Sequence, residues 1–154
     1  MLDIEKINKI TDPKVRRQLK IDILNSVKRK KDTKIKHDFL TFVKHIWPDF
    51  IEGSHHKTIS EKFNKLLAGT ANRLIINMPP RHTKSEFASY FLPAWMIGNN
   101  PKLKIIQATH TAELAVRFGR KTKHLMDSQE YKDLFNTRLQ EDSKAAGRWE
   151  TAQG

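Results

Sequence analysis

The sequence contains no cysteine, so neither disulfide bonds nor thiolate metal sites can form. It also lacks any apolar run near the roughly 18 residues that a membrane-spanning helix needs. Residues 1–6 do not resemble the apolar core of a signal peptide. We therefore expect a soluble, intracellular chain. Its 154 residues, 38% of them hydrophobic, suffice for one domain with a core.

Acidic residues are scarce, because 17 Asp and Glu stand against 29 Lys and Arg, a net charge of +12. Such a balance favours a polyanionic partner, most simply nucleic acid. A basic, solvated surface is the alternative. The excess is concentrated in residues 1–36, which we interpret as a basic helical N-terminal arm. Its basic residues are Lys6, Lys9, Lys14, Arg16, Arg17, Lys20, Lys28, Arg29, Lys30, Lys31, Lys34 and Lys36.

Within this arm, Asp12 is expected to cap a helix that has Pro13 in its first position. Apolar residues recur every four positions from Val15 to Val27, which predicts one apolar face. The cluster at residues 28–31 is expected to end this helix, where cations suit the helix dipole. The cluster can equally be a solvated helix end or a patch that contacts phosphates.

Residues 37–154 show alternating helical and extended patterns, which we interpret as part of an ATPase domain. Helices are predicted at 38–47, from a cap at Ser54 to Gly69, and at 84–97 with a kink at Pro93. Another is expected after Thr109 or Thr111, and a short one at 131–135. Residues 74–78 and 103–108 read as buried strands, and 148–151 can begin a third. Strand, loop, helix and strand in this order predict an α/β fold with a parallel sheet.

The segment between the first strand and its helix resembles a phosphate-binding P-loop. The sequence at 78–85 is Met-Pro-Pro-Arg-His-Thr-Lys-Ser, whereas the usual pattern is G-x-x-x-x-G-K-[ST]. Met78 and Thr83 occupy the two glycine positions. Glycine there permits positive φ, which a β-branched residue resists. We therefore expect either a strained Thr83 or a different path for the loop.

The chemistry expected of this loop depends on its last residues. Lys84 is placed to contact the β- and γ-phosphates, and the Ser85 hydroxyl is placed to ligate Mg²⁺. Pro79 and Pro80 have no N–H groups, so residues 81–85 must supply the backbone donors. The alternative is a proline-rich turn before a helix, with a solvated Lys84.

Several blocks in order resemble the large terminase subunit of tailed bacteriophages, the motor that packages viral DNA. They are Phe42–Pro48 with His55, Arg73–Glu86, Pro93–Trp95, Ile105–Ala115 and Asp142–Trp149. The resemblance covers residues 37–154 and implies a P-loop NTPase domain of the RecA-like, additional-strand class. It also implies ATP and Mg²⁺ as cofactors and translocation of double-stranded DNA into a procapsid.

The resemblance implies specific roles for individual residues. Arg81 is a candidate catalytic finger, and Arg148 is another basic candidate. His55, or alternatively His56, matches a position near the adenine, although an ordinary helix-start histidine is the plainer interpretation. Thr109 ends the second strand, where such motors couple nucleotide state to DNA; a helix cap is the alternative. The expected nucleotide-binding residues are Pro80, Arg81, His82, Thr83, Lys84 and Ser85.

The sequence lacks the carboxylates that ATP hydrolysis by a P-loop domain would need. P-loop hydrolysis requires an apolar strand that ends in Asp, and no such strand follows Ser85. No acidic triad for two-metal nuclease chemistry is present either. We therefore expect the N-terminal fragment of a longer subunit, truncated before the Walker B strand and without the nuclease domain. Such a fragment is expected to bind nucleotide weakly and to hydrolyse none.

The resemblance further implies a small terminase subunit and a portal or procapsid as partners, a homo-oligomeric ring, no membrane association, and the cytoplasm of an infected bacterial host. Two other classes remain open from the residues. One is a module that binds nucleic acid or a protein partner and retains a vestigial P-loop. The other is a fragment of a different P-loop motor, such as a helicase.

Overall fold

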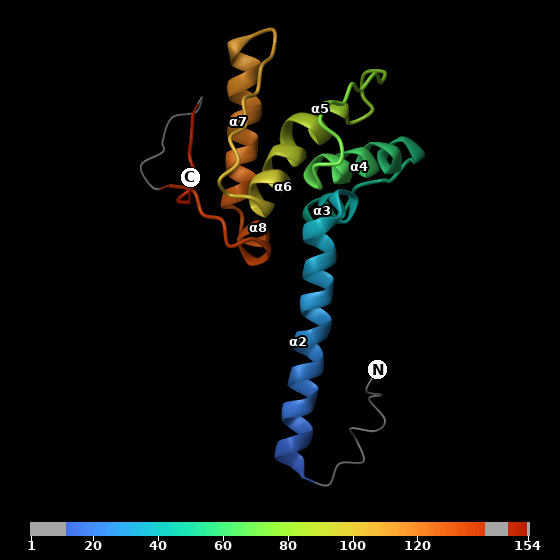
Figure 1. Ribbon diagram of the computed structural model, residues 1–154, viewed down its shortest axis with the longest axis vertical. Coiled ribbons are helices and arrows are strands. Elements are labelled where there is room, and N and C mark those ends of the chain that lie inside the picture. The colour runs from blue at the N-terminus through green and yellow to red at the C-terminus, as the bar shows by residue number, and fades with distance from the viewer. Residues whose placement is uncertain (1–11, 141–147, 154) are drawn as a thin grey trace. The chain divides into compact units, whose positions relative to one another are not determined.

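The computed structural model describes residues 12–140 and 148–153, and its regular structure is helical (Figure 1). Within those residues there is no strand, and one isolated antiparallel bridge joins Leu139 and Thr151. The helices in chain order are α2 (Pro13–His37), α3 (Phe39–Ile46), α4 (Ser54–Leu67), α5 (Lys84–Glu86), the π-helical turn η1 (Phe87–Phe91), α6 (Leu92–Asn99), α7 (Ala112–Asp127) and α8 (Gln129–Leu134).

The predicted α/β fold with a parallel sheet is therefore wrong. Residues 74–78 are extended but form no ladder with another segment in the described part of the chain. Leu74, Ile76 and Met78 pack against the helical core, whereas Ile75 is 86% exposed. A strand buried on both faces would hide every side chain of this run. The apolar run is thus an extended segment that packs on one side only.

Residues 103–108, the second predicted strand, form no strand either, and apolar side chains of this run are also exposed. Ile105 is 39% exposed and Ile106 is 96% exposed. Beyond a turn bond from Leu103 N–H to the Asn100 carbonyl, its backbone makes no hydrogen bond to other described backbone groups. Residues 148–151 form no strand either: Thr151 takes part in the isolated bridge, and its hydroxyl donates to the Pro101 carbonyl at 2.9 Å. Short apolar runs do not specify a sheet unless a neighbouring strand satisfies their backbone groups.

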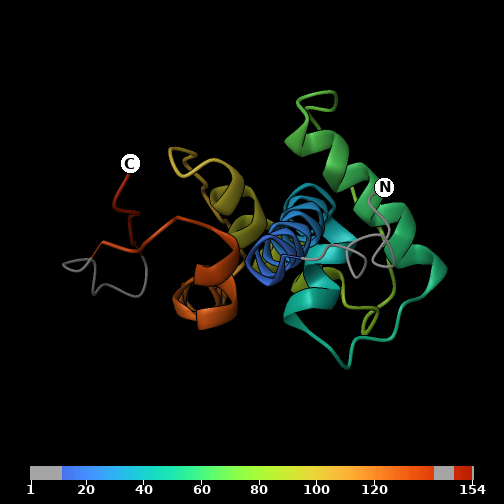
Figure 2. The ribbon, with the colours of Figure 1, turned by 90° about the horizontal axis from the view of Figure 1, so that it is seen from below.

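The chain divides into two compact units, residues 1–34 and 35–154. Helix α2 supplies the described part of the first unit and is seen nearly end-on in Figure 2. Asp12 accepts a hydrogen bond from the Lys14 N–H at 2.8 Å, as expected for a cap. The cluster at 28–31 lies inside α2, which continues to His37, so the predicted helix end was wrong.

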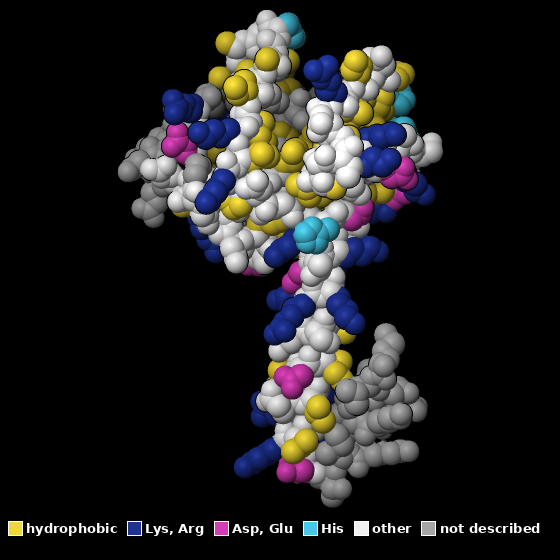
Figure 3. Space-filling view, in the orientation of Figure 1, with side chains coloured by type: hydrophobic (Ala, Val, Ile, Leu, Met, Phe, Trp, Pro, Cys, Tyr) yellow, Lys and Arg dark blue, Asp and Glu magenta, His cyan; other side chains and the backbone are white. Residues whose placement is uncertain are grey.

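The expected apolar face of α2 is not buried, since Val15 and Val27 are both exposed. Lys and Arg side chains instead line the helix along much of its length (Figure 3). A helix that is polar on most sides gains little from packing and depends on propensity and side-chain pairs. No helix in residues 12–140 and 148–153 has both the length and the apolar character needed to cross a bilayer.

Local signals set the ends of α3 and α4 as predicted, except at one cap. Asp38 caps α3 by accepting from the Thr41 N–H at 2.8 Å. Gly69, with φ of +71°, ends α4 through bonds from Gly69 N–H to the Leu66 carbonyl and from Thr70 N–H to the Lys65 carbonyl. The N-cap of α4 is Gly53 rather than Ser54, which is the first helical residue.

Residues 84–99 form one continuous helical stretch, as the sequence predicted for 84–97, with a π-helical turn at Phe87–Phe91. Pro93 follows this turn and cannot donate a backbone hydrogen bond, so the carbonyl four residues earlier loses its α-helical partner. That carbonyl belongs to Ser89, and it accepts instead from Gln107 Nε2 at 3.1 Å. The extended segment at 103–108 is thereby tied to the helix that begins at Lys84.

Aromatic side chains form the core of the second unit. Phe39 lies at its centre and makes edge-to-face contacts with Phe63, Phe87 and Trp95, with ring centroids 4.9, 5.4 and 5.4 Å away. Trp95 Nε1 donates to the Lys36 carbonyl at 2.7 Å. This core fixes the stretch from residue 84 to residue 99 and therefore the base of the loop before it.

Substitution of Gly98 by alanine is expected to destabilise this core. A Cβ at this position would lie 2.7 Å from two ring atoms of Phe135 and 2.7 Å from the Tyr131 hydroxyl. Because both side chains are buried, relief requires a backbone shift, which costs about 1–3 kcal/mol of unfolding free energy. Urea unfolding of Gly98→Ala measures this loss. An unchanged midpoint would show that the helix packing adjusts freely.

Candidate functional site

The loop between the extended segment and α5 has an unusual backbone. Thr83 has φ of +57° and ψ of 9°, and Arg81 has φ of +66°. They are the non-glycine residues with positive φ in the described part of the chain. Position 83 is where a P-loop carries glycine, so the structure takes the strained course that the sequence left as one of two options.

Lys84 begins the helix and spans the loop. Its Nζ donates to the Met78 carbonyl at 3.3 Å, so the cation sits at the entrance of the loop. The first helical backbone bond runs from Phe87 N–H to the Thr83 carbonyl at 2.9 Å. The backbone N–H groups of residues 84–86 precede that bond and are the ones an anion at this helix start would use.

The remaining loop side chains lie at the surface. Arg81, His82 and Ser85 are exposed, and His82 Nδ1 lies 2.9 Å from the Pro80 carbonyl. An exposed hydroxyl at position 85, a cation at position 84 and unbonded N–H groups are the groups that a magnesium-bound triphosphate requires. The loop therefore fits such a ligand, with Lys84 on phosphate oxygens and Ser85 on the metal.

The start of α4 lies against this loop. His56 Nε2 is 2.7 Å from Thr83 Oγ1, and the ring centroids of His55 and His82 are 5.6 Å apart. The His55 and His56 rings are 3.8 Å apart, and His55 Nε2 is buried without a hydrogen-bond partner. The structure thus brings the expected adenine-side histidine to the loop. These histidines form no metal site, because no metal-binding group of three side chains occurs within residues 12–140 and 148–153.

Two acids near the loop, Glu52 and Glu86, are paired with lysines. Lys44 and Lys57 bind the Glu52 carboxylate and hold its pKa below its usual value. Lys121 binds Glu86 at 2.7 Å, and its Nζ also lies 4.9 Å from the centre of the Tyr90 ring. Burial, reinforced by the Glu86 charge, raises the pKa of Tyr90. Burial and the neighbouring His55 lower the pKa of His56.

Two residues expected to act with the loop make their described contacts elsewhere. Thr109 donates to the Thr111 carbonyl at 2.6 Å, and Thr111 is the residue that caps α7. Arg148 pairs with Glu150 at 3.0 Å. The sequence indicated His56 only as an alternative to His55, whereas in the structure His56 Nε2 is the atom that contacts Thr83. Its position three residues after a helix-capping glycine was the available signal.

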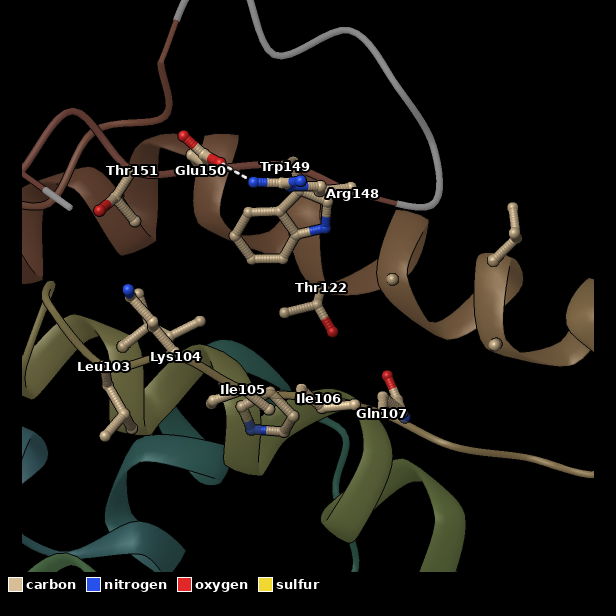
Figure 4. A pocket seen from close by; sticks show the side chains of 15 residues that line it. Leu103, Lys104, Ile105, Ile106, Gln107, Thr122, Arg148, Trp149, Glu150 and Thr151 are labelled. Atoms are coloured by element: carbon tan, nitrogen blue, oxygen red, sulfur yellow. Dashed lines mark hydrogen bonds and ion pairs between the residues drawn. The ribbon is translucent and has the colours of Figure 1, made fainter.

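A cavity of about 630 Å³ lies apart from the loop residues, between the segment at 103–107, α7 and residues 148–151. Figure 4 shows Trp149 on one side of this cavity, with Ile105 and Ile106 on the opposite side. The two extended segments thus face a shared space instead of pairing. Its lining combines apolar side chains with Lys104, Gln107, Thr122 and the paired Arg148 and Glu150.

The loop at 78–85 with the start of α4 is therefore the candidate site. It gathers a cation, an exposed hydroxyl, free helix-start N–H groups and a buried histidine on one feature of the fold. Comparison of the chain with protein-family models, with curated proteins and with solved structures gives no match.

Proposed function

We propose that the chain binds Mg²⁺–ATP through residues 80–85, as a segment of a terminase-type DNA-packaging subunit. The observation that carries the nucleotide part is the left-handed conformation of Thr83 directly before Lys84. This conformation turns the chain at the position where a P-loop has its glycine, so the N–H groups of the helix start face the loop. The blocks of sequence that resemble terminases carry the packaging part.

In this proposal, Lys84 offsets the charge of the β- and γ-phosphates, and Ser85 contributes its hydroxyl to Mg²⁺. The bound magnesium ion supplies charge neutralisation between the phosphates. Lys84 must first leave the Met78 carbonyl, which it contacts at the long end of the hydrogen-bond range, so little is lost by its release. Arg81, exposed on the same loop, is the candidate finger.

The proposal includes binding without turnover. Hydrolysis requires a carboxylate that orients water or holds the metal. The acid nearest in sequence to the loop is Glu86, and Lys121 contacts both of its carboxylate oxygens, at 2.9 and 2.7 Å. This ion pair holds the Glu86 carboxylate on Lys121, which supports binding without turnover.

Substitution of Lys84 by alanine is expected to weaken Mg²⁺–ATP binding by at least about tenfold, because a charge-assisted contact to phosphate contributes roughly 1.5–3 kcal/mol. Equilibrium titration with a fluorescent ATP analogue measures the affinity. Lys84→Arg keeps the charge and should retain part of it. Lys102→Ala, an exposed lysine outside the loop, is the matched control and should leave affinity unchanged.

Equal affinity of wild type and Lys84→Ala would contradict nucleotide binding by the loop. Phosphate release by the purified chain that depends on Lys84 would contradict the absence of turnover. The resemblance extends the proposal to double-stranded DNA, a small terminase subunit and the procapsid as partners, and to assembly as a ring in the cytoplasm of an infected bacterial cell.

A second candidate function is nucleic-acid binding by α2. Nine basic residues occur between positions 13 and 34, against two acids, Asp22 and Asp32. Eight of the nine are exposed, and they fall into two groups, at positions 14–20 and 28–34, which suits contact with a phosphate backbone. The nine are Lys14, Arg16, Arg17, Lys20, Lys28, Arg29, Lys30, Lys31 and Lys34.

A further inference from the structure

A chain of hydrogen bonds runs from the start of α4 into the loop. Gly53 N–H donates to His56 Nδ1 at 2.8 Å, and His56 Nε2 lies 2.7 Å from Thr83 Oγ1. Thr83 Oγ1 in turn donates to the His82 carbonyl at 2.7 Å. Because Nδ1 accepts the hydrogen bond from Gly53 N–H, a neutral ring must carry its own proton on Nε2. His56 Nε2 is therefore the donor to Thr83.

The neighbours of His56 hold its ring in place. The side chain is 5% exposed and packs between Phe50 and Phe87, with ring centroids 4.7 and 5.0 Å away. Thr83 has the opposite property, since its left-handed backbone is strained for a β-branched residue. A fixed donor on its hydroxyl opposes relaxation of that strain. A glycine at position 83 would need no such support.

We propose that His56 is a positioning residue that keeps Thr83 in the left-handed conformation only while its imidazole is neutral. The inference rests on the proposed function, because the conformation it preserves is the phosphate-binding one. Protonation would place a hydrogen on Nδ1, directly facing the Gly53 N–H. The ring would then lose its acceptor and move, and the loop would lose the contact that supports Thr83.

The groups that face His56 favour its neutral form. From α4, His55 lies beside it, and from the loop, His82 contributes positive charge when protonated; both disfavour a second cation. From the connector, Glu52 favours protonation, but Lys44 and Lys57 offset its charge. From η1, the neighbour is the uncharged Phe87. Burial, and after it the charges of His55 and His82, lowers the pKa of His56 below its ordinary value of 6.5.

This shift has a defined sign for stability. A histidine whose pKa is lowered by folding takes up its proton in the unfolded chain first as the pH falls. Its contribution to the unfolding free energy is therefore complete above about pH 6.5 and declines as the pH drops below that value. The left-handed Thr83 population should fall over the pH range in which the folded His56 titrates.

A double-mutant cycle with a ligand-free readout tests the inference. All four proteins, wild type, His56→Ala, Thr83→Gly and the double variant, are compared by Mg²⁺–ATP affinity. Wild type and His56→Ala are also compared by the Cα and Cβ chemical shifts of Thr83. His56→Ala should shift Thr83 toward ordinary backbone values and weaken binding by about tenfold in the Thr83 background. In the Thr83→Gly background it should weaken binding no more than about twofold. Equal losses in both backgrounds would reduce His56 to a packing residue.

The pH profile gives an independent readout in the wild-type chain. Titration followed by imidazole ¹⁵N shifts should show the proton on Nε2 at pH 8 and a coincident transition of His56 and Thr83 at lower pH. His56→Gln, which keeps a donor amide but does not titrate, should abolish the Thr83 transition even if His56→Ala fails to fold. His45→Ala, at an exposed position, is the matched control and should leave it intact.

The outcomes separate this inference from the proposed function. A Thr83 backbone that stays left-handed after His56 is protonated overturns the inference, whatever the nucleotide affinity. A chain that shows the coupled His56 and Thr83 transition but binds no Mg²⁺–ATP at any pH supports the positioning role and overturns nucleotide binding.

Discussion

Substitution of Phe39 by alanine should lower the free energy of unfolding by about 3–5 kcal/mol, the range for removing a fully buried aromatic ring. Phe39 is 0% exposed, and its ring meets three other aromatic rings edge to face. The neighbours belong to α4, η1 and α6, so no single helix movement can fill the space. Lost dispersion contacts and the remaining cavity both contribute to the destabilisation.

Urea unfolding of wild type and Phe39→Ala, followed by far-ultraviolet circular dichroism, measures this loss. Ile51→Ala is the matched control, because Ile51 is apolar but 87% exposed, and its loss should stay within about 0.5 kcal/mol. Similar losses in the two variants would contradict a core centred on Phe39. A loss confined to the slope of the transition would indicate a change in the unfolded chain instead.

Double-stranded DNA binding by the chain should fall by about a thousandfold between roughly 50 and 200 mM salt, the loss expected when about six phosphates are neutralised. The expectation follows from the nine basic residues at positions 13–34 of α2, eight of which are exposed. Each phosphate contact releases condensed counterions, so the logarithm of the affinity falls linearly with the logarithm of the salt concentration. Fluorescence anisotropy of a labelled duplex across a salt series gives the slope.

A four-residue variant tests whether α2 carries this binding. Replacing residues 28–31 with glutamine should reduce the salt slope by up to about 3.6, since each phosphate contact contributes roughly 0.9. A variant with four exposed basic residues of the second unit changed to glutamine is the matched control for net charge. An equal reduction in the control would attribute binding to overall charge. The control positions are Lys102, Lys104, Arg117 and Arg120.

The ends of the helices could be predicted from the sequence because local chemistry decides them. Asp38 and Thr111 accept backbone N–H groups of their own helices, and Gly69 adopts the positive φ that ends α4. Each of these interactions involves residues within a few positions along the chain. The end of α2 was predicted wrongly, because the cluster at 28–31 contains no residue that stops a helix.

The predicted sheet was wrong, because strand pairing depends on residues far apart in the sequence. Residues 74–78 and 103–108 have apolar runs compatible with strands, yet Ile75 and Ile106 are almost fully exposed. A run of this length becomes a strand only where another extended segment lies beside it with matching hydrogen-bonding groups. Here helices and a cavity occupy those positions.

The loop at 78–85 is the part of the candidate site that could be predicted from the sequence. Its residue types and order left a strained Thr83 as one of two options, and the backbone takes that option. The contact from His56 could not be foreseen, because it joins residues 27 positions apart and depends on how α4 meets the loop. His55 and His56 are adjacent, and they differ in the packing of His56 against Phe50 and Phe87 and in its hydrogen bonds to Gly53 and Thr83.

The π-helical turn at Phe87–Phe91 determines how the loop before Lys84 is rotated about the helix axis relative to the core. Successive residues of an α-helix are rotated by about 100°, so one residue more or fewer in this turn would rotate everything before it relative to α6. With Trp95 anchored, deletion of a single residue there would point Lys84 and Ser85 toward a different side of the molecule. A change in the length of this turn should therefore reorient the loop, which a substitution that keeps its length does not do.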